Sequence, residues 1–208
     1  MLRLKSKCKI CRRYGEKMFM KGERDLGPKC AHTRRGTRPG MHGKARRRNI
    51  SEFSTQLKEK QKVRYTYGIT DTALRKAFTE AARMTGRTNE ALVQILERRL
   101  DNAVFRAGFA VSRGVARHIV SHGHITVNGR RVNIPSYRVW SGDVIAVRKE
   151  SLESLAFAEL ANRLKNTEPP EWLDLNREER SAVVKALPTA DAISEGRDMS
   201  LVVEFYSK

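Results

Sequence analysis

RLDNAVFRAGFAVSRGVARHIVSHGHITVNGRRVNIPSYRVWSGDVI, residues 99–145, is the stretch of this chain with the most regular pattern. Its first half predicts two helices, the second of which extends from an N-capping Ser112 to Gly123. Two short β-rich runs then flank Asn128-Gly129, and this pair predicts a hairpin because a type I′ turn needs two positive φ angles. The following run DVIAVR predicts a further strand. The stretch is therefore expected to form two helices followed by a small antiparallel sheet.

The residues before this stretch, 51–97, have helical periodicity with short connections. Ser51 predicts the N-cap of a first helix that places Phe53, Leu57 and Val63 on its inner side. Two further helices are expected, with inner residues Leu74, Ala77, Phe78 and Ala81 in one and Ala91, Leu92, Ile95 and Leu96 in the other. This segment is predicted to be an all-helical domain.

The residues after the stretch are acidic and less regular. SLESLAFAELANRL predicts a helix that ends before Pro169-Pro170. WLDLN, SAVVKAL and LVVEFYSK each fit either a short strand or an amphipathic helical turn, and periodicity leaves both alternatives open. The acidic part is expected to pack on the preceding domains.

Charge divides the chain in the same way. The formal net charge is +19, and residues 1–50 contribute 17 Lys and Arg against 3 acidic residues. A basic excess of this size indicates a polyanionic partner, most commonly nucleic acid, although a solvated surface is the simpler alternative. Gly and Pro in RRGTRPGMHGKARRR interrupt regular structure, so this part is predicted to be an arm that becomes ordered on RNA.

Other functional classes find little support in the sequence. No apolar run approaches the roughly 18 residues of a membrane-spanning helix, and the arm lacks the periodicity of a membrane-surface helix, so no membrane partner is expected. No phosphate-binding glycine loop, Gly-x-Ser-x-Gly or His-Glu-x-x-His motif occurs, so neither an enzyme nor a small-molecule substrate is expected. Three cysteines do not suggest a disulfide scaffold and favour a reducing compartment.

Residues 99–145 resemble the RNA-binding module named after small-subunit ribosomal protein four. LKEKQKVRYTYGI at 57–69, PPEWL at 169–173 and LVVEFYSK at 201–208 resemble segments of the bacterial ribosomal protein itself. KCKICRRYGEKMFMKGER at 7–24 and PGMHGKARRR at 39–48 fit the same family. The resemblance to the bacterial small-subunit ribosomal protein four family therefore covers essentially the whole chain.

This resemblance implies an α+β protein in four parts. They are a basic N-terminal arm with a cysteine cluster at 1–50, the helical domain at 51–97, the RNA-binding module at 98–150 and the acidic C-terminal part at 151–208.

The resemblance also implies a role in the cytoplasmic ribosome, with an organellar ribosome left open. The family binds the 5′ domain of 16S rRNA early in assembly and nucleates the body of the small subunit. It lies near the mRNA entrance, beside ribosomal proteins three and five, and many bacterial members repress translation of their own operon. The alternative is a non-ribosomal RNA- or DNA-binding stress protein that uses the same module.

Cations on rigid elements are the expected RNA-binding groups, because affinity for folded RNA comes mainly from phosphates. The candidates are Arg3, Lys7, Arg12, Arg13, Arg34, Arg35, Lys44, Arg46, Arg47, Arg48, Lys58, Lys60, Lys62, Arg64, Arg98, Arg99, Arg106, Ser112, Arg113, Arg117, His122, Arg130 and Arg131. Pairing of several module arginines with Glu97, Asp101 or Asp143 is the structural alternative. Tyr65 and Tyr67 are expected either to stack on bases or to pack in the core.

The cysteines lie together in CKICRRYGEKMFMKGERDLGPKC, residues 8–30. Zinc-bearing members of the resembled family carry four cysteines, and here Asp25 stands at the third position. One hypothesis is a structural zinc on Cys8, Cys11 and Cys30 with Asp25 or His32 as fourth ligand, forming a zinc knuckle. The other is a set of free thiols. No other cofactor is expected.

Overall fold

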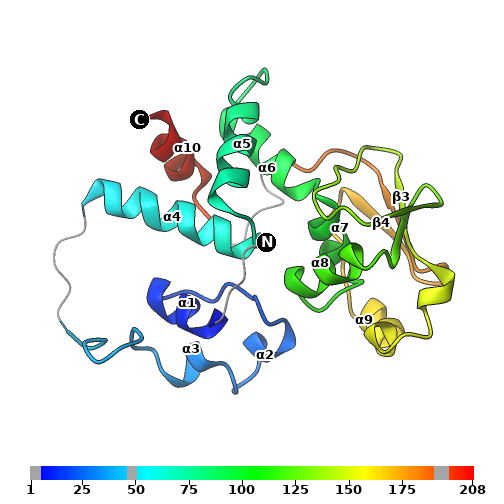
Figure 1. Ribbon diagram of the computed structural model, residues 1–208, viewed down its shortest axis with the longest axis horizontal. Coiled ribbons are helices and arrows are strands. Elements are labelled where there is room, and N and C mark those ends of the chain that lie inside the picture. The colour runs from blue at the N-terminus through cyan, green and yellow to red at the C-terminus, as the bar shows by residue number, and fades with distance from the viewer. Residues whose placement is uncertain (1–5, 46–50, 190–196) are drawn as a thin grey trace. The chain divides into compact units, whose positions relative to one another are not determined.

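The computed structural model describes residues 6–45, 51–189 and 197–208 (Figure 1). The chain divides into two compact units. The first, here called the N-terminal unit, takes in residues 1–89 and 194–208, and the second, the sheet unit, takes in residues 90–193. None of the helices in the described ranges is long and apolar enough to span a bilayer.

The arm contains three short helices: α1 (Lys7–Tyr14), α2 (Glu23–Leu26) and α3 (Ala31–Arg34). Cys11, Met18 and Met20 form a small buried cluster, against which Tyr14 and Tyr65 pack. A local apolar core therefore organises the described part of the arm. The sequence prediction missed this core because two methionines among so many cations do not form a recognisable stripe.

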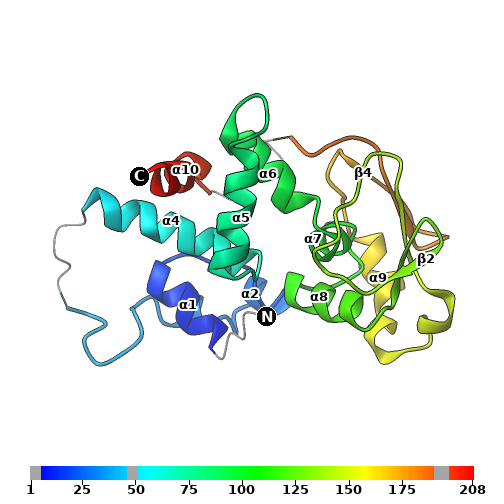
Figure 2. The same cartoon turned by 45° about the horizontal axis from the view of Figure 1, so that its top comes forward.

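Three longer helices complete the N-terminal unit: α4 (Glu52–Thr66), α5 (Asp71–Ala81) and α10 (Met199–Ser207). Ser51 caps α4 as predicted, because its hydroxyl accepts a hydrogen bond from the Ser54 amide at 3.3 Å. LVVEFYSK is helical, and α10 lies beside α4 in both views (Figures 1 and 2).

The prediction that Phe53 faces inward is wrong, since 58% of the residue is exposed. Its ring lies at the edge of the α4–α10 contact, 5.7 Å from the Phe205 ring. Gln56 occupies the interior instead and donates hydrogen bonds to Glu52 and Glu204. The partner helix lies far along the chain, so the local pattern of α4 could not reveal which face it covers.

The sheet unit begins with α6 (Thr88–Glu97), most of which belongs to it, followed by α7 (Leu100–Arg106) and α8 (Arg113–Ser121). Ser112 caps α8 by accepting from the Val115 amide at 3.4 Å. At the other end Gly123 has φ 72°, and its amide and that of His124 bond to the carbonyls of Val120 and Ile119. This is the left-handed helix end predicted for glycine.

The sheet has five antiparallel strands in the order β2-β1-β3-β5-β4. The strands are β1 (Ile125–Val127), β2 (Arg130–Val132), β3 (Val144–Val147), β4 (Leu173–Asn176) and β5 (Ser181–Val184). Asn128 and Gly129 both have positive φ, 51° and 76°, which confirms the β1–β2 hairpin. The sheet is larger than the expected module sheet, because WLDLN and SAVV supply β4 and β5.

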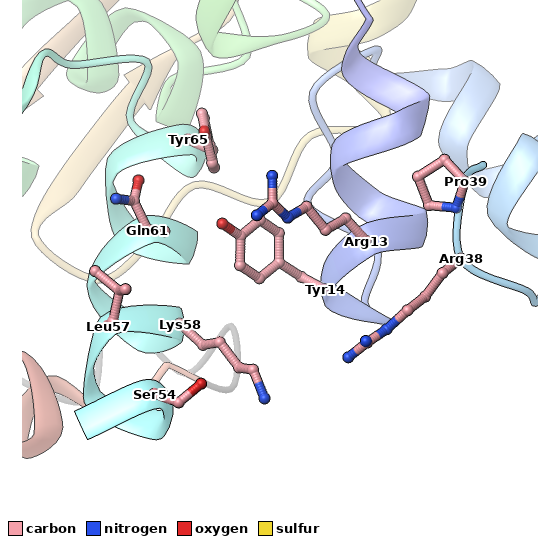
Figure 3. A pocket seen from close by; sticks show the side chains of 9 residues that line it. All are labelled: Arg13, Tyr14, Arg38, Pro39, Ser54, Leu57, Lys58, Gln61 and Tyr65. Carbon is pink, nitrogen blue, oxygen red and sulfur yellow. The ribbon is translucent and has the colours of Figure 1, made fainter. Parts of the chain in front are cut away.

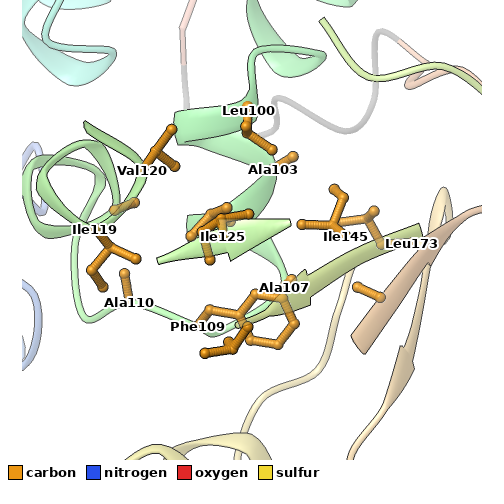
Figure 4. Close-up of a cluster of buried hydrophobic side chains, with 14 of the residues drawn as sticks. Leu100, Ala103, Ala107, Phe109, Ala110, Ile119, Val120, Ile125, Ile145 and Leu173 are labelled. Atoms are coloured by element: carbon orange, nitrogen blue, oxygen red, sulfur yellow. The ribbon is translucent and has the colours of Figure 1, made fainter. Parts of the chain in front are cut away.

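The predicted helix over SLESLAFAELANRL is only partly correct. The structure has two 3₁₀ turns, η1 (Lys149–Ser151) and η2 (Leu155–Phe157), before the short helix α9 (Leu160–Lys165). Leu160 and Leu164 are buried in the core that α7, α8 and the sheet share. Figure 4 shows that Ile119 and Val120 of α8, Ile125 of β1 and Ile145 of β3 meet in this core.

We expect Ile145→Ala to destabilise the sheet unit by about 2–5 kcal/mol, because the side chain is fully buried and its removal leaves a cavity. Urea unfolding followed by tryptophan fluorescence measures this change, since Trp140 and Trp172 both lie in the sheet unit. Val144→Ala on the same strand is the control, because Val144 is 38% exposed. Equal losses for both variants would contradict the assigned register of β3.

Candidate nucleic-acid interface

The β1–β2 hairpin presents two exposed arginines on the edge strand of the sheet. Arg130 and Arg131 pair in register with Val127 and Thr126, and the Arg131 guanidinium donates to the His122 carbonyl at 3.2 Å. The hydrogen bond ties one cation to the end of α8. The hairpin is thus a rigid carrier of positive charge.

A line of imidazoles adjoins this edge. The ring centroids of His118 and His122 are 6.5 Å apart and those of His122 and His124 are 6.2 Å apart. His118 and His122 are exposed, whereas His124 is half-buried and its Nδ1 lies 2.9 Å from the Ser151 hydroxyl. His122 thus lies between the helix surface and the basic hairpin.

Several module arginines are held by acids of the same unit, as the structural alternative requires. The buried Asp101 carboxylate accepts two hydrogen bonds from Arg99, at 3.0 and 2.8 Å, and one from Arg117 at 3.1 Å. Two guanidiniums on one carboxylate leave a net positive charge. Asp101 therefore fixes the direction of both cations without neutralising them, and their contact with RNA stays a prediction.

A second buried acid organises the starts of α7 and α8. Glu97 is fully buried and accepts from Arg106 at 3.0 and 3.2 Å and from Asn102 at 2.8 Å. Asn102 in turn accepts from the Arg113 Nε at 2.8 Å. In the sequence these polar residues stand beside the apolar positions of the helices. Helical periodicity alone would assign them to an exposed face, so it does not predict this buried network.

Arg98 and Ser112 also lie inside the sheet unit rather than on its surface. Arg98 is 5% exposed, donates to the Val139 carbonyl at 2.9 Å and lies 3.7 Å from the Trp140 ring centre. Ser112 is 2% exposed and caps α8. Asp143, a suggested arginine partner, instead accepts from the Asn128 amide group at 2.8 Å. These contacts stabilise the fold.

The predicted cations of α4 separate into two pairs. Lys60 and Lys62 are buried: Lys60 pairs with Asp71 at 2.6 Å, and Lys62 pairs with Glu59 at 2.6 Å and with Glu16. Lys58 and Arg64 are half-buried, and the Arg64 guanidinium lies 4.7 Å from the Tyr65 ring centre. Tyr67 is buried, in keeping with the packing alternative.

In the arm, some predicted cations bind the chain itself and others are exposed. Lys7 donates to the Met20 carbonyl at 3.1 Å, and Arg12 donates to the carbonyls of Thr37 and Arg38 at 2.9 and 3.3 Å. The exposed ones are Arg13, Arg34, Arg35 and Lys44. Arg3, Arg46, Arg47 and Arg48 lie outside the described residues.

The zinc hypothesis is not supported. Among residues 6–45, 51–189 and 197–208, no group of three or more His, Cys, Asp and Glu side chains is arranged to hold a metal ion. Cys8, Cys11 and Cys30 are free cysteines. Asp25, one suggested fourth ligand, is buried and accepts from the Lys21 amide at 2.8 Å.

The pKa values of the two buried thiols, Cys11 and Cys30, are shifted in opposite directions. Burial raises the pKa of Cys11, and nearby Asp25 raises it further, whereas a backbone hydrogen bond at Met18 opposes this. Burial also acts to raise the pKa of Cys30, but hydrogen bonds from the Thr33 and His32 backbone and from the Thr33 side chain together outweigh it, and the pKa is lowered. His32, the other suggested ligand, thus contributes its backbone to this interaction.

We expect Glu97→Gln to lower the free energy of unfolding of the sheet unit by about 1.5–3 kcal/mol, because it replaces the charge-assisted hydrogen bonds between buried Glu97 and partly buried Arg106. The measurement is urea unfolding followed by tryptophan fluorescence. Glu150→Gln is the matched control, because Glu150 is exposed and pairs only at the surface with Arg148. A loss no larger than that of the control would show that Arg106 does not depend on Glu97.

We also expect acid to weaken the sheet unit through His124. Burial lowers its pKa, and the positive charges of neighbouring His122, Arg131 and Arg148 lower it further. The unfolded chain therefore takes up the proton more readily, so stability is complete above the ordinary value of 6.5 and falls as pH decreases below it. Urea unfolding at several pH values should give a shallower decline for His124→Gln. Identical declines would contradict this assignment.

Comparisons with known proteins agree with this arrangement. The family model "Ribosomal protein S4/S9 N-terminal domain" matches residues 3–97, and the model "S4 domain" matches residues 98–145. The chain is 49% identical over 203 residues to "Small ribosomal subunit protein uS4" of Pelotomaculum thermopropionicum, which covers 98% of this chain and 97% of the relative. It is 49% identical to the protein of that name in Gloeobacter violaceus, over 97% of this chain and 96% of the relative. The chain therefore belongs to the small ribosomal subunit protein uS4 family.

Proposed function

We propose that this protein is a structural component of the small ribosomal subunit that binds the 5′ domain of 16S rRNA. Membership of the uS4 family over nearly the full chain supports this proposal. The observation that carries the RNA-binding part is positive charge on rigid elements. Arg130 and Arg131 extend from a paired hairpin, and Asp101 holds Arg99 and Arg117 in fixed directions. Cationic side chains that are already held in one conformation lose little conformational entropy when they bind phosphates.

The protein's place in the subunit is part of the same proposal. We infer that it binds rRNA early and nucleates assembly of the subunit body, near the mRNA entrance and beside ribosomal proteins three and five. Repression of its own message would use the same RNA-binding surface on a second folded RNA. The resemblance of the sequence to its family supports these roles, and a cytoplasmic ribosome is the proposed location.

No catalytic step, cofactor or small-molecule substrate forms part of the proposal. The relatives carry the name of a ribosomal subunit protein. The alternative function is a stress protein that binds RNA and duplex DNA equally well. At matched salt, strong preference for folded 5′-domain rRNA over duplex DNA supports the ribosomal role, whereas equal competition would overturn it.

We expect the double variant Arg130→Gln/Arg131→Gln to bind 5′-domain rRNA more weakly, with the slope of log affinity against log salt reduced by about 1–2. The measurement is a filter-binding titration at several salt concentrations. Lys185→Gln is the control, because Lys185 pairs with Asp174 at 3.2 Å in the acidic part of the chain. Unchanged slopes in both variants would exclude the hairpin from phosphate contact.

A further inference from the structure

A pocket of ≈560 Å³ lies in the N-terminal unit between the arm and α4 (Figure 3). Its volume falls within the roughly 300–1,000 Å³ of sites that hold small ligands. The wall residues that bear on its chemistry are Arg13, Tyr14, Arg38, Lys58, Gln61 and Tyr65. Cationic, aromatic and amide groups from distant parts of the sequence thus surround one space.

Three cations from separate segments line the pocket: Arg13 of α1, Arg38 of the following segment and Lys58 of α4. None of the described residues that line it is acidic. In Figure 3 the side chains of Arg38 and Lys58 extend into the space between the arm and α4. Arg12 holds the backbone at Arg38 through its hydrogen bond of 3.3 Å. An anion in this space would reduce the mutual repulsion of the three cations.

Two aromatic rings form another side of the pocket. The centroids of Tyr14 and Tyr65 are 5.9 Å apart and their planes are inclined by 50°. Burial raises the pKa of Tyr14, so its hydroxyl stays neutral near a phosphate. Because the rings are tilted rather than stacked face to face, a flat group can contact one face. Nucleic-acid bases are the flat groups that tyrosines in RNA-binding proteins receive.

Two buried polar atoms of the pocket residues are unpartnered. Within the described parts of the chain, Gln61 Oε1 accepts no hydrogen bond and Arg38 Nε donates none. A buried polar atom without a partner is destabilising, so such atoms usually have a ligand to satisfy them. Both atoms are closed to solvent, so each side chain must turn toward the pocket before Gln61 Oε1 can accept from an exocyclic amine of a base and Arg38 Nε can donate to a phosphate oxygen.

We propose that this pocket receives one unpaired nucleotide extruded from the bound rRNA. Its base stacks on Tyr14 or Tyr65 and donates an amine hydrogen to Gln61, while its phosphate lies among Arg13, Arg38 and Lys58. This inference rests on the proposed function, because the nucleotide belongs to the rRNA that the protein is proposed to bind. The arm and α4 would then recognise one unpaired nucleotide of that rRNA. An exocyclic amine excludes uracil as the favoured base.

Photochemical crosslinking at 254 nm of the full chain with a 5′-domain transcript tests the position of the nucleotide. After digestion, mass spectrometry identifies both the modified peptide and the attached base. We expect an adduct of A, C or G on the peptide of Tyr14 or Tyr65, and millimolar free AMP present during irradiation should not prevent its formation. Adducts confined to other peptides, an adduct of uridine alone, or loss of crosslinking when AMP is present during irradiation would overturn the proposal.

Affinity of variants tests whether the contact matters. We expect the double variant Tyr14→Leu/Tyr65→Leu to weaken rRNA binding about tenfold, because the stacked base is lost whichever ring holds it, and Tyr14→Phe/Tyr65→Phe to stay within about twofold. Tyr65 also packs against the arm cluster, so Arg38→Gln is a second variant that removes no apolar contact. Its matched control is Arg83→Gln, an exposed arginine after α5 that removes the same charge.

The outcomes distinguish the two proposals. If wild type prefers folded rRNA but Tyr14→Leu/Tyr65→Leu and Arg38→Gln bind no more weakly than Arg83→Gln, only the pocket proposal fails. A wild-type protein without preference for rRNA over duplex DNA overturns the proposed function itself. Weaker binding without an adduct at either tyrosine also counts against the pocket, because the variants then act through folding.

Discussion

The buried carboxylate of Glu97 is the group on which the sheet unit depends most. It ends α6, accepts hydrogen bonds from two of the guanidinium nitrogens of Arg106 and accepts another from the Asn102 side-chain amide. Asn102 passes the connection on to Arg113 at the first turn of α8. An unpaired carboxylate in this position would be very costly, so the three helices can adopt only an arrangement that brings these donors to it. One buried acid therefore connects α6, α7 and the start of α8.

Features that depend on neighbouring residues were predictable from the sequence. Asn128-Gly129 gave the hairpin because the turn geometry excludes most other residues, and Ser51 and Ser112 cap the helices that follow them. In each case the energetic reason lies within four residues of the signal. Such local signals do not depend on the tertiary contacts of the rest of the chain.

Features that depend on distant partners were not predictable. Phe53 is largely exposed because it lies at the edge of the face of α4 that α10, far along the chain, covers. The segments WLDLN and SAVV in the C-terminal part have no decisive periodicity. They become strands only because β5 pairs with β3 and β4 pairs with β5. For the candidate site, the sequence identified the cations and offered Glu97 and Asp101 as alternative partners of the module arginines. It did not reveal the partners of Arg98, Lys60 and Lys62, which were placed on the surface although they are buried. The pocket residues Tyr14 and Arg38 meet α4 only through the folded arm.

The position of β5 has a consequence for synthesis. β3 lies between β1 and β5, so the sheet stays open along one side until residues 181–184 are made. In the N-terminal unit α4 likewise lacks its neighbour until α10 follows at residues 199–207. In both units the last segment to leave the ribosomal exit tunnel, β5 or α10, is the one that covers an element made earlier. A nascent chain stalled before these segments would expose an unpaired strand edge and an uncovered helix face, the kind of surface that chaperones bind.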